Sequence, residues 1–449
     1  MLRDALLAFG ILFAVYTKLR VAGSPIGPGE AAIALWLLVT LVREARNDIV
    51  WSRAALVLAA FWIALATALC IGTMVSFVLA ASTSRAHFLH DCTAYAMLAI
   101  LSLLAVIQRD ANYRLRRTVA ILVALGSATL ALQIAEGFGA FDLPIEIWFY
   151  DRLEGWSTNA NQLGLLSLAM TLLALHLAET AQRWTTRCLA VAGTVMPVAA
   201  GVLSKSDAFM LTLAVAVPLL LAVHAARAMR EAARHPAMPS FIALVAFVLA
   251  VPTATGVAAL AERFTTSARS AGQVLVTLEP NLERDVGYRT ELLGLGLGEA
   301  AASGFLGLGP GPHLRRPADL REPQWDDTPN FEAHNTVVDL LMQGGMLALI
   351  ALAGLGVATL RHCRRAGLIA LPMLLLGLAA FGLSHFIIRH PLVWLVVAVA
   401  LTQRPATSRP SAHVRVLVRP GFLLNLGNAG KMIIRHEPAS SGRGRNFWL

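Results

Sequence analysis

Charged residues are scarce in this sequence, and their scarcity limits the class of protein. Only 14% of the 449 residues are Asp, Glu, Lys or Arg, whereas 57% are hydrophobic and the mean hydropathy is +0.65. Soluble globular proteins typically contain about 45 to 50% apolar residues. The composition therefore excludes a soluble globule and predicts an all-α, polytopic membrane protein.

Several motifs of enzyme chemistry are also missing. The four cysteines are scattered, with no CxxC or Cys/His spacing, which argues against structural disulfides and against a zinc site. There is no phosphate loop of the GxxxxGK type, and the alternating glycines between 294 and 298 follow no strand, which argues against ATP hydrolysis and dinucleotide binding. We therefore expect neither a metal ion nor an organic cofactor.

The net charge of +10 does not indicate a nucleic-acid partner. The basic residues occur in short clusters between apolar runs, as they do in the cytoplasmic loops of membrane proteins. A nucleic-acid-binding protein would instead present a basic stripe along one face. The clusters are therefore interpreted as markers of membrane topology.

Long apolar runs dominate the chain and predict about twelve membrane helices, since each needs roughly 20 mostly apolar residues. Their approximate positions are 5–21, 30–42, 54–77, 93–107, 118–135, 163–178, 188–203, 209–225, 241–261, 336–360, 368–386 and 392–401. The chain would then comprise nine helices in residues 1–261, one large polar loop in 262–333 between helices nine and ten, three helices in 334–403 and a basic tail in 404–449.

The distribution of basic residues predicts the orientation of these helices, because short cytoplasmic loops carry an excess of Lys and Arg. Basic clusters follow each even-numbered helix, whereas acidic residues dominate the loop after the fifth helix. Lys18 and Arg20, at the end of the first helix, disagree with this pattern. We expect both termini in the cytoplasm and the loop 262–333 on the opposite face.

The basic tail in 404–449 contains no apolar run long enough to span a membrane. It would either adhere to anionic lipid headgroups or remain a solvated, disordered segment. The second interpretation is favoured, because this composition cannot bury a core.

The segment 141–161, which follows the fifth helix, combines aromatic residues with acids. Most of its aromatic residues are typical of a membrane interface. Arg152 is a lone cation in this acidic loop, and Asn161 lies at the entrance to the next helix. Arg152 would be either a structural ion-pair partner or a bidentate ligand for a phosphate.

The long polar interval has three parts that would bring polar side chains to the membrane surface. Arg289 opens an apolar segment, the run 304–313 is rich in glycine and proline and predicts a tight loop, and His334–Asn335 begins the next helix. A histidine at a helix start is most often a surface or capping residue. The chemical alternative is a base, because the positive end of the helix dipole disfavours imidazolium.

Taken together, these motifs resemble the O-antigen ligase and polymerase superfamily of bacterial envelope proteins. The run 334–341, followed by Gly344–Gly345, is similar to the His motif of that family. The run 307–311, with Gly309 and Gly311, resembles the glycine turn before that motif, and Arg289 matches the arginine of the large loop. Residues 152–161 are similar to the Arg-, Gly- and Asn-rich entrance to the sixth helix.

The sequence also departs from the family. Many members have Ser-Arg near the outer start of the eighth helix, where this chain reads Ser204–Lys205–Ser206–Asp207. Lys205 either supplies the missing cation or that contact is absent. An acid at Asp207 beside a phosphate would be unfavourable unless it were paired.

The resemblance implies a glycosyltransferase in the bacterial inner membrane. Its donor would be an undecaprenyl-diphosphate-linked glycan, and its acceptor would be a hydroxyl group of a lipid- or glycan-linked molecule at the periplasmic face. Arg289 and Arg152, with Lys205, would bind the donor diphosphate without a metal. His334 would take the acceptor proton in an inverting displacement, supported by Asn335, Asn161, Gly309 and Gly311.

Three other interpretations stay open at this point. Within the family, the sequence does not separate an O-antigen ligase from a repeat-unit polymerase, because both use the same carrier and a hydroxyl acceptor. A secondary transporter has a similar helix count, but it usually carries polar residues at the middle of the membrane. A purely structural membrane protein would not require Arg289 or His334.

Overall fold

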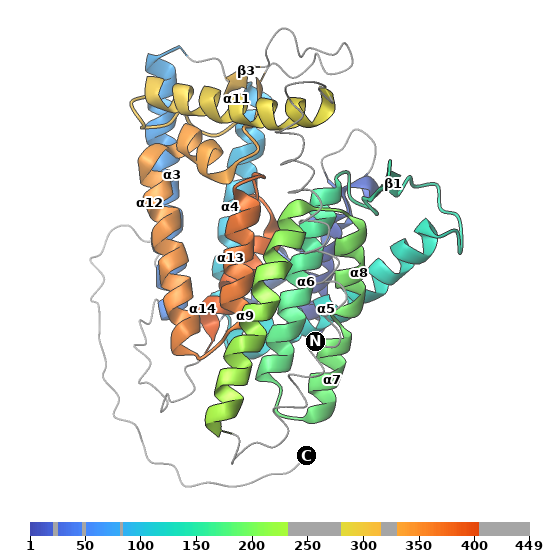
Figure 1. Cartoon of the computed structure of the whole chain (residues 1–449). Helices are drawn as coiled ribbons and strands as arrows, with labels where there is room; N and C mark the ends of the chain where they lie inside the picture. The colour runs from blue at the N-terminus through green and yellow to red at the C-terminus, as the bar shows by residue number, and fades with distance from the viewer. Residues whose placement is uncertain (21–25, 47–50, 81–83, 232–279, 316–329, 404–449) are drawn as a thin grey trace, which may run out of the picture.

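The computed structural model describes residues 1–20, 26–46, 51–80, 84–231, 280–315 and 330–403 of the chain. These parts are predominantly helical and contain two short antiparallel strand pairs. Most of the helices stand side by side in one bundle, and α11 lies across one end of it (Figure 1).

The elements have the following bounds. The helices are α1 (Leu2–Val15), the 3-10 helix η1 (Thr17–Leu19), α2 (Pro28–Glu44), α3 (Arg53–Val78), α4 (Arg85–Ile107), α5 (Ala111–Gly137), α6 (Ala160–Thr180), α7 (Trp184–Ala192), α8 (Val195–Leu203), α9 (Asp207–Glu231), α11 (Pro280–Ala302), α12 (Thr336–Arg365), α13 (Ala370–Gly382) and α14 (Pro391–Thr402). The strand pairs are β1 (Trp148–Phe149) with β2 (Arg152–Leu153), and β3 (Leu314–Arg315) with β4 (Asn330–Phe331).

A helix is present in each predicted segment that lies within the described residues. The predicted seventh segment is shared by α7 and α8, and the predicted ninth, at 241–261, lies outside the described residues. By length and apolar composition, seven helices of the described parts can cross a membrane. The all-α, membrane-spanning class is thus confirmed, whereas the number of twelve spans stays a prediction.

The predicted polar loop contains a helix as well as loops, because α11 occupies much of it. The remaining parts of that interval at 262–279 and 316–329, like the basic tail at 404–449, lie outside the described residues. The division of the chain into these parts stays a prediction.

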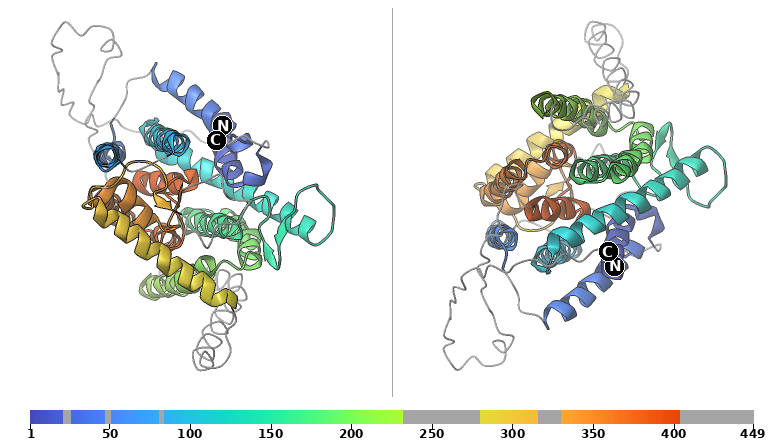
Figure 2. Two further views of the ribbon diagram at one scale, coloured as in Figure 1. Left: turned by 90° about the horizontal axis from the view of Figure 1, so that it is seen from above. Right: turned by 90° about the horizontal axis from the view of Figure 1, so that it is seen from below.

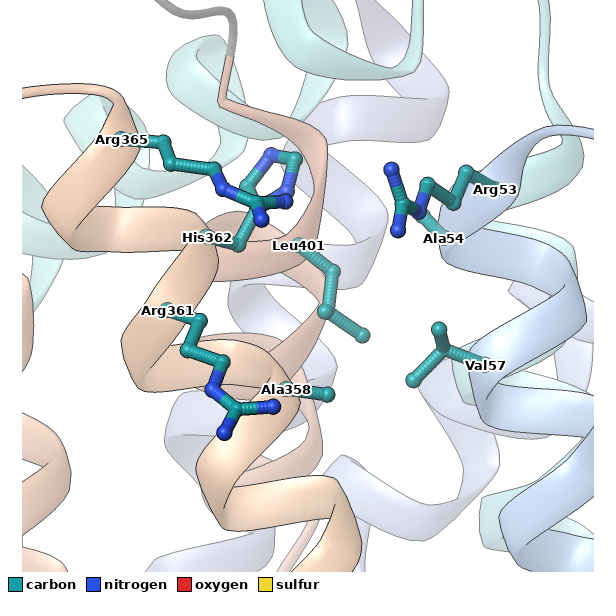
Figure 3. A pocket seen from close by; sticks show the side chains of 8 residues that line it. All are labelled: Arg53, Ala54, Val57, Ala358, Arg361, His362, Arg365 and Leu401. Carbon is teal, nitrogen blue, oxygen red and sulfur yellow. The ribbon is translucent and has the colours of Figure 1, made fainter.

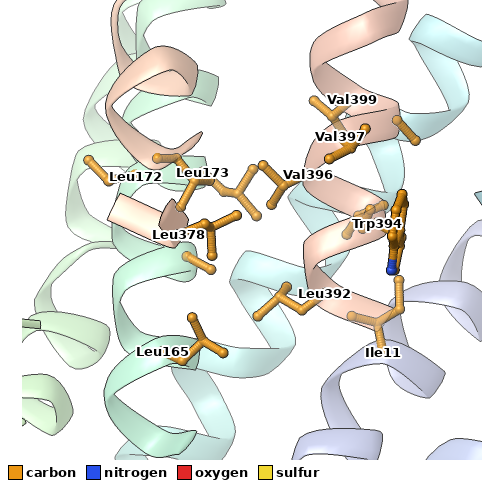
Figure 4. Packing of buried hydrophobic residues seen from close by; sticks show 14 of the residues in the cluster. Ile11, Leu165, Leu172, Leu173, Leu378, Leu392, Trp394, Val396, Val397 and Val399 are labelled. Atoms are coloured by element: carbon orange, nitrogen blue, oxygen red, sulfur yellow. The ribbon is translucent and has the colours of Figure 1, made fainter. Parts of the chain in front are cut away.

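Helix α6 is the centre of the bundle. Buried side chains make up 83% of its apolar window, against 39% to 44% in the other candidate spans. Its leucines pack against α13, as Figure 4 shows for Leu173 beside Leu378 of α13. A helix that is apolar around its whole circumference is expected in such a fully enclosed position.

Helices α13 and α14 are short for membrane spans, and the reason lies in the connection between them. The twelve residues of α14 extend about 18 Å, which is less than the roughly 30 Å of a bilayer core. Phe386, Ile387 and Ile388 of the connecting segment are buried in the protein. The segment predicted as helix up to residue 386 ends at Gly382.

Helix α12 is interrupted at Gly345, where φ is +63° and ψ is −162°. A Cβ at this position would lie 2.2 Å from the carbonyl oxygen of Phe305. The next N–H group, that of Met346, donates a hydrogen bond to the same carbonyl at 2.9 Å. Both the conformation and the close approach therefore require glycine here.

The glycine-rich turn at 304–313 provides partners for backbone groups that the interruption leaves without helical partners. The N–H of Leu308 donates to the carbonyl of Met342 at 2.7 Å, and the N–H of Gly309 donates to the carbonyl of Gln343 at 2.8 Å. Gly72 of α3 completes this junction, because a Cβ there would be 2.5 Å from both Gly309 N and Gln343 O. The turn is thereby fixed between α3 and α12.

Helix α11 packs against the part of α12 that precedes the interruption. Leu292 and Ala300 of α11 share a buried apolar cluster with Val338 and Met342 of α12. The approach is close at Gly296, where a Cβ would lie 2.4 Å from a side-chain carbon of Val338. The view from above in Figure 2 shows α11 crossing the end of the bundle. The start of α12 is therefore held beside α11.

We predict that Gly345→Ala destabilises the protein by at least about 2 kcal/mol, because alanine is strained in this backbone conformation and its Cβ has no space. Thermal unfolding of the purified protein in detergent would measure the effect. Gly354→Ala is the matched control, since Gly354 lies in the regular part of α12 with nothing near its Cβ position. Equal melting temperatures of the two variants would contradict the prediction.

Candidate functional site

His334 lies immediately before α12, close to the part of that helix that α11 contacts. Its side chain is exposed, and its backbone is left-handed with φ of +52°. Such a conformation costs a non-glycine residue on the order of 1 to 3 kcal/mol and is concentrated at functional sites. The surrounding structure must therefore hold His334 in place.

Two side chains at the start of α12 fix the backbone around His334. The carboxylate of Asp339 accepts hydrogen bonds from the N–H groups of Ala333 at 2.7 Å and Asn335 at 3.0 Å. The side-chain oxygen of Asn335 caps α12 by accepting hydrogen bonds from two N–H groups of its first turn. Hydrogen bonds therefore hold the backbone on both sides of His334.

The connection between α13 and α14 forms the support for this segment. The amide of Asn335 donates to the carbonyl of Leu383 at 2.7 Å, and the hydroxyl of Thr336 donates to the carbonyl of His385 at 2.6 Å. In return, the N–H of Ile387 donates to the Thr336 hydroxyl at 3.0 Å. The start of α12 is therefore attached to a buried part of the bundle.

A partly buried ionic cluster lies beside this support. Arg389 donates one hydrogen bond to Asp91 of α4 and another to Glu332, which precedes His334 by two residues. Gln343 extends the cluster, because its amide donates to Asp91 at 3.4 Å and its carbonyl accepts from the hydroxyl of Tyr95 at 2.6 Å. Segments far apart in the sequence are joined at this point.

The charges in this cluster show what Arg389 does. Burial opposes its positive charge, but Glu332 and Asp91 outweigh burial and raise the pKa of the guanidinium above its ordinary value. Two carboxylates face one guanidinium, so the cluster offers no surplus positive charge to a phosphate group. Arg389 is therefore a positioning residue for the segment that carries His334.

His313, in the glycine-rich turn, is a buried structural residue. Its Nε2 lies 2.8 Å from the carbonyl of Gly309, to which it donates a hydrogen bond. Burial lowers its pKa, which keeps the ring neutral. Since its side chain is only 7% exposed, it is poorly placed to meet a substrate, in contrast to His334.

Arg152 belongs to a second cluster, formed by the β1–β2 hairpin with α6 and the end of α8. Its Nε donates to the carbonyl of Ser204 at 3.2 Å, and its Nη2 donates to the side-chain oxygen of Asn161 at 3.1 Å. The hairpin is short, and the positive φ of Tyr150 forms its turn. Two predicted site residues, Arg152 and Asn161, are thus brought into direct contact.

Lys205 lies in the same cluster but is paired with an acid. Its Nζ forms an ion pair with Asp151, and this hydrogen bond lowers the pKa of the carboxyl. Both side chains are substantially exposed, at 46% and 73%. The backbone of Lys205 is left-handed, with φ of +49°, at the corner between α8 and α9. Lys205 is therefore next to Arg152 in space, with its charge partly offset.

The predicted site residues are distributed over two clusters and the turn. His334 and Asn335 lie together at the start of α12, Arg152, Asn161 and Lys205 lie around the hairpin, and Gly309 lies in the turn that packs on α12. Gly311 follows in that turn with φ of +121°. The backbone of Arg289 lies in α11, but its side chain is outside what the structure describes.

The sequence interpretation missed four residues of the first cluster: Asp91, Glu332, Asp339 and Arg389. One signal was available, because charged residues within or beside membrane helices are costly and usually paired. The partners could not be assigned from spacing, since 298 positions separate Asp91 from Arg389.

We predict that Arg389→Gln destabilises the protein by about 3 kcal/mol, because it removes the guanidinium that faces the buried Asp91 and the partly buried Glu332. The matched control is Arg20→Gln, which breaks the more exposed pair with Glu30 and is expected to cost less than about 1 kcal/mol. Thermal unfolding in detergent would compare the two. A smaller effect of Arg389→Gln than of Arg20→Gln would show that the cluster is not structural.

The region that contains the start of α12 is similar to a known protein family. Residues 192–353 match the family model described as O-antigen ligase, a range that covers less than half of the chain and includes Lys205, Arg289, Gly309 and His334. No curated protein and no solved structure matches the chain. The matched range includes the exposed, left-handed His334 just before α12, so this part of the chain is similar to the O-antigen ligase family.

Proposed function

We propose that the protein transfers a glycan from an undecaprenyl-diphosphate carrier to an acceptor hydroxyl group at the periplasmic face of the bacterial inner membrane. One observation carries this proposal: His334 is exposed in a left-handed conformation that Asp339 and Asn335 fix, within the region that matches the family. A strained and well-supported polar residue is expected where chemistry occurs.

His334 would act as the general base. The acceptor oxygen attacks the sugar carbon that carries the diphosphate, and the bond from that carbon to the diphosphate oxygen breaks. The electron pair leaves with the diphosphate, and the acceptor proton moves to a ring nitrogen of His334. A single displacement of this kind inverts the configuration at the sugar carbon.

The leaving diphosphate needs positive charge as the bond breaks, and arginine side chains would supply it without a metal. Arg152 is suited to this role because two of its nitrogens are already fixed by Ser204 and Asn161, so little ordering remains when a phosphate arrives. Arg289, on α11, would contribute the second guanidinium. Lys205 would contribute only if a phosphate displaced Asp151.

We predict that His334→Ala and Arg289→Ala each lower glycan transfer at least about 100-fold, because each removes a group that acts in the transition state. The assay would measure transfer from the carrier-linked glycan to its acceptor in membranes that contain equal amounts of each variant. His87→Ala, which changes a histidine in the first turn of α4, is the matched control and should retain activity. Normal transfer by both test variants would refute the mechanism.

The choice between ligase and polymerase rests on the acceptor. We favour a ligase, and deletion of the gene followed by gel analysis of surface glycans tests this choice. Accumulation of carrier-linked polymer that is not attached to its acceptor would support a ligase. Accumulation of single, unpolymerised repeats would instead identify a polymerase.

We further propose that the end of the bundle crossed by α11 faces the periplasm and that the N-terminus lies in the cytoplasm. At the opposite end, Asp4 forms ion pairs with Arg114 and Arg117, which follow the fourth predicted helix. Lys18 and Arg20, the two exceptions to the charge pattern, form ion pairs with Glu154 and Glu30.

We predict that a cysteine at Ala302, the exposed end of α11, reacts with a membrane-impermeant maleimide applied to intact cells made permeable at the outer membrane. A cysteine at Arg183, an exposed residue before α7, should react only after the inner membrane is opened. Both substitutions require a background in which the four native cysteines are replaced by serine. The reverse labelling pattern would invert the proposed topology.

A further inference from the structure

A cavity lies between α3, α12 and α14 at the end of the bundle opposite α11. Its volume is about 160 Å³, which is smaller than the roughly 300 to 1,000 Å³ of sites for drug-sized molecules. Its lining residues are Arg53, Ala54, Val57, Ala358, Arg361, His362, Arg365 and Leu401. Figure 3 shows that Arg53 reaches toward the cavity from α3, while Arg361 and Arg365 reach toward it from α12.

The charges around this cavity are all of one sign. Within the described parts of the chain, Arg53, Arg361 and Arg365 form no ion pair, and no acidic residue lines the cavity. Arg361 and Arg365 are four residues apart on one helix face, where like charges destabilise each other. Arg53 occupies the first residue of α3, where the helix dipole also disfavours a cation. The three arginines are exposed and hydrated, and together they form a cluster of positive charge that would favour an anion.

His362 is the fourth polar residue that lines the cavity. The Nε2 of His362 donates a hydrogen bond of 2.6 Å to the carbonyl of Gln403, the residue that follows α14. This bond ties the end of α12 to the end of α14. The position of Arg361 and Arg365 is therefore fixed relative to α14, as a preformed site requires.

The other side of the cavity is apolar and continues toward the membrane interior. Val57, Ala358 and Leu401 lie between the arginines in Figure 3. Leu56 and Ile63 of α3 are exposed and lie three and ten residues after Arg53, on approximately the same helix face. On α12, Val357 and Ile350 are exposed and lie four and eleven residues before Arg361. An exposed apolar stripe therefore follows Arg53 along α3 and another precedes Arg361 along α12.

We propose that this cavity binds the phosphate headgroup of an anionic phospholipid, with the acyl chains lying along the exposed apolar stripes of α3 and α12. Guanidinium groups bind phosphate oxygens through paired hydrogen bonds, and basic pockets between membrane helices bind such headgroups. A free phosphate ion would use the arginines but not the stripes. The lipid explains both features.

The test is binding of phosphatidylglycerol to the purified full chain in neutral detergent, measured by native mass spectrometry, with phosphatidylcholine as the neutral lipid. The variant Arg53→Gln/Arg361→Gln/Arg365→Gln should bind phosphatidylglycerol at least about tenfold more weakly than the wild type. The control Arg46→Gln/Arg183→Gln/Arg364→Gln removes three exposed arginines that do not line the cavity, and it should bind like the wild type.

Thermal unfolding separates loss of binding from loss of folding. Without anionic lipid, the cavity variant should melt near the wild-type temperature, because the three arginines are exposed and form no ion pair within the described residues. With phosphatidylglycerol, the wild type should gain several degrees and the cavity variant should not. Equal loss of binding in the control variant, or unchanged binding in the cavity variant, would overturn the proposal. Equal stabilisation by inorganic phosphate would show a free-anion site instead.

Discussion

The interruption of α12 is the constraint on which much of this structure depends. A helix that breaks in a membrane protein exposes carbonyl and N–H groups that lipid cannot satisfy. Here the glycine-rich turn supplies their partners through Phe305, Leu308 and Gly309. This exchange of hydrogen bonds fixes the first part of α12 beside α11, and with it the position of His334. The packing of this end of the bundle therefore also determines where His334 lies.

The two ends of the bundle are specialised differently. At the end crossed by α11, Arg389 is paired with Asp91 and Glu332, and these contacts position backbone segments. At the opposite end, the arginines of the cavity face one another across α3 and α12. Unpaired cations of this kind are suited to contact with anionic lipid headgroups.

The sequence proposed the candidate site as a set of positions, but it could not assign their contacts. It selected Arg152 and Asn161, and the structure joins them through a hydrogen bond. It associated Gly309 with the turn before the His motif. The structure shows that the N–H of Gly309 donates a hydrogen bond to the carbonyl of Gln343 at the break in α12. It did not select Asp339, because one acid near a helix start is common, and only folding shows that it holds the backbone of Ala333 and Asn335.

The sequence by itself determined the class of the protein, because hydrophobic runs and the clustering of arginines are local properties of the chain. It also determined the resemblance to a family, because motif order is linear. Only the tertiary structure decided that α13 and α14 enclose an irregular segment, that Arg389 pairs with two distant acids and that three arginines converge on one cavity. These features join residues whose separation in the chain carries no periodic signal. Burial and charge compensation, which bring them together, exist only after the helices have packed.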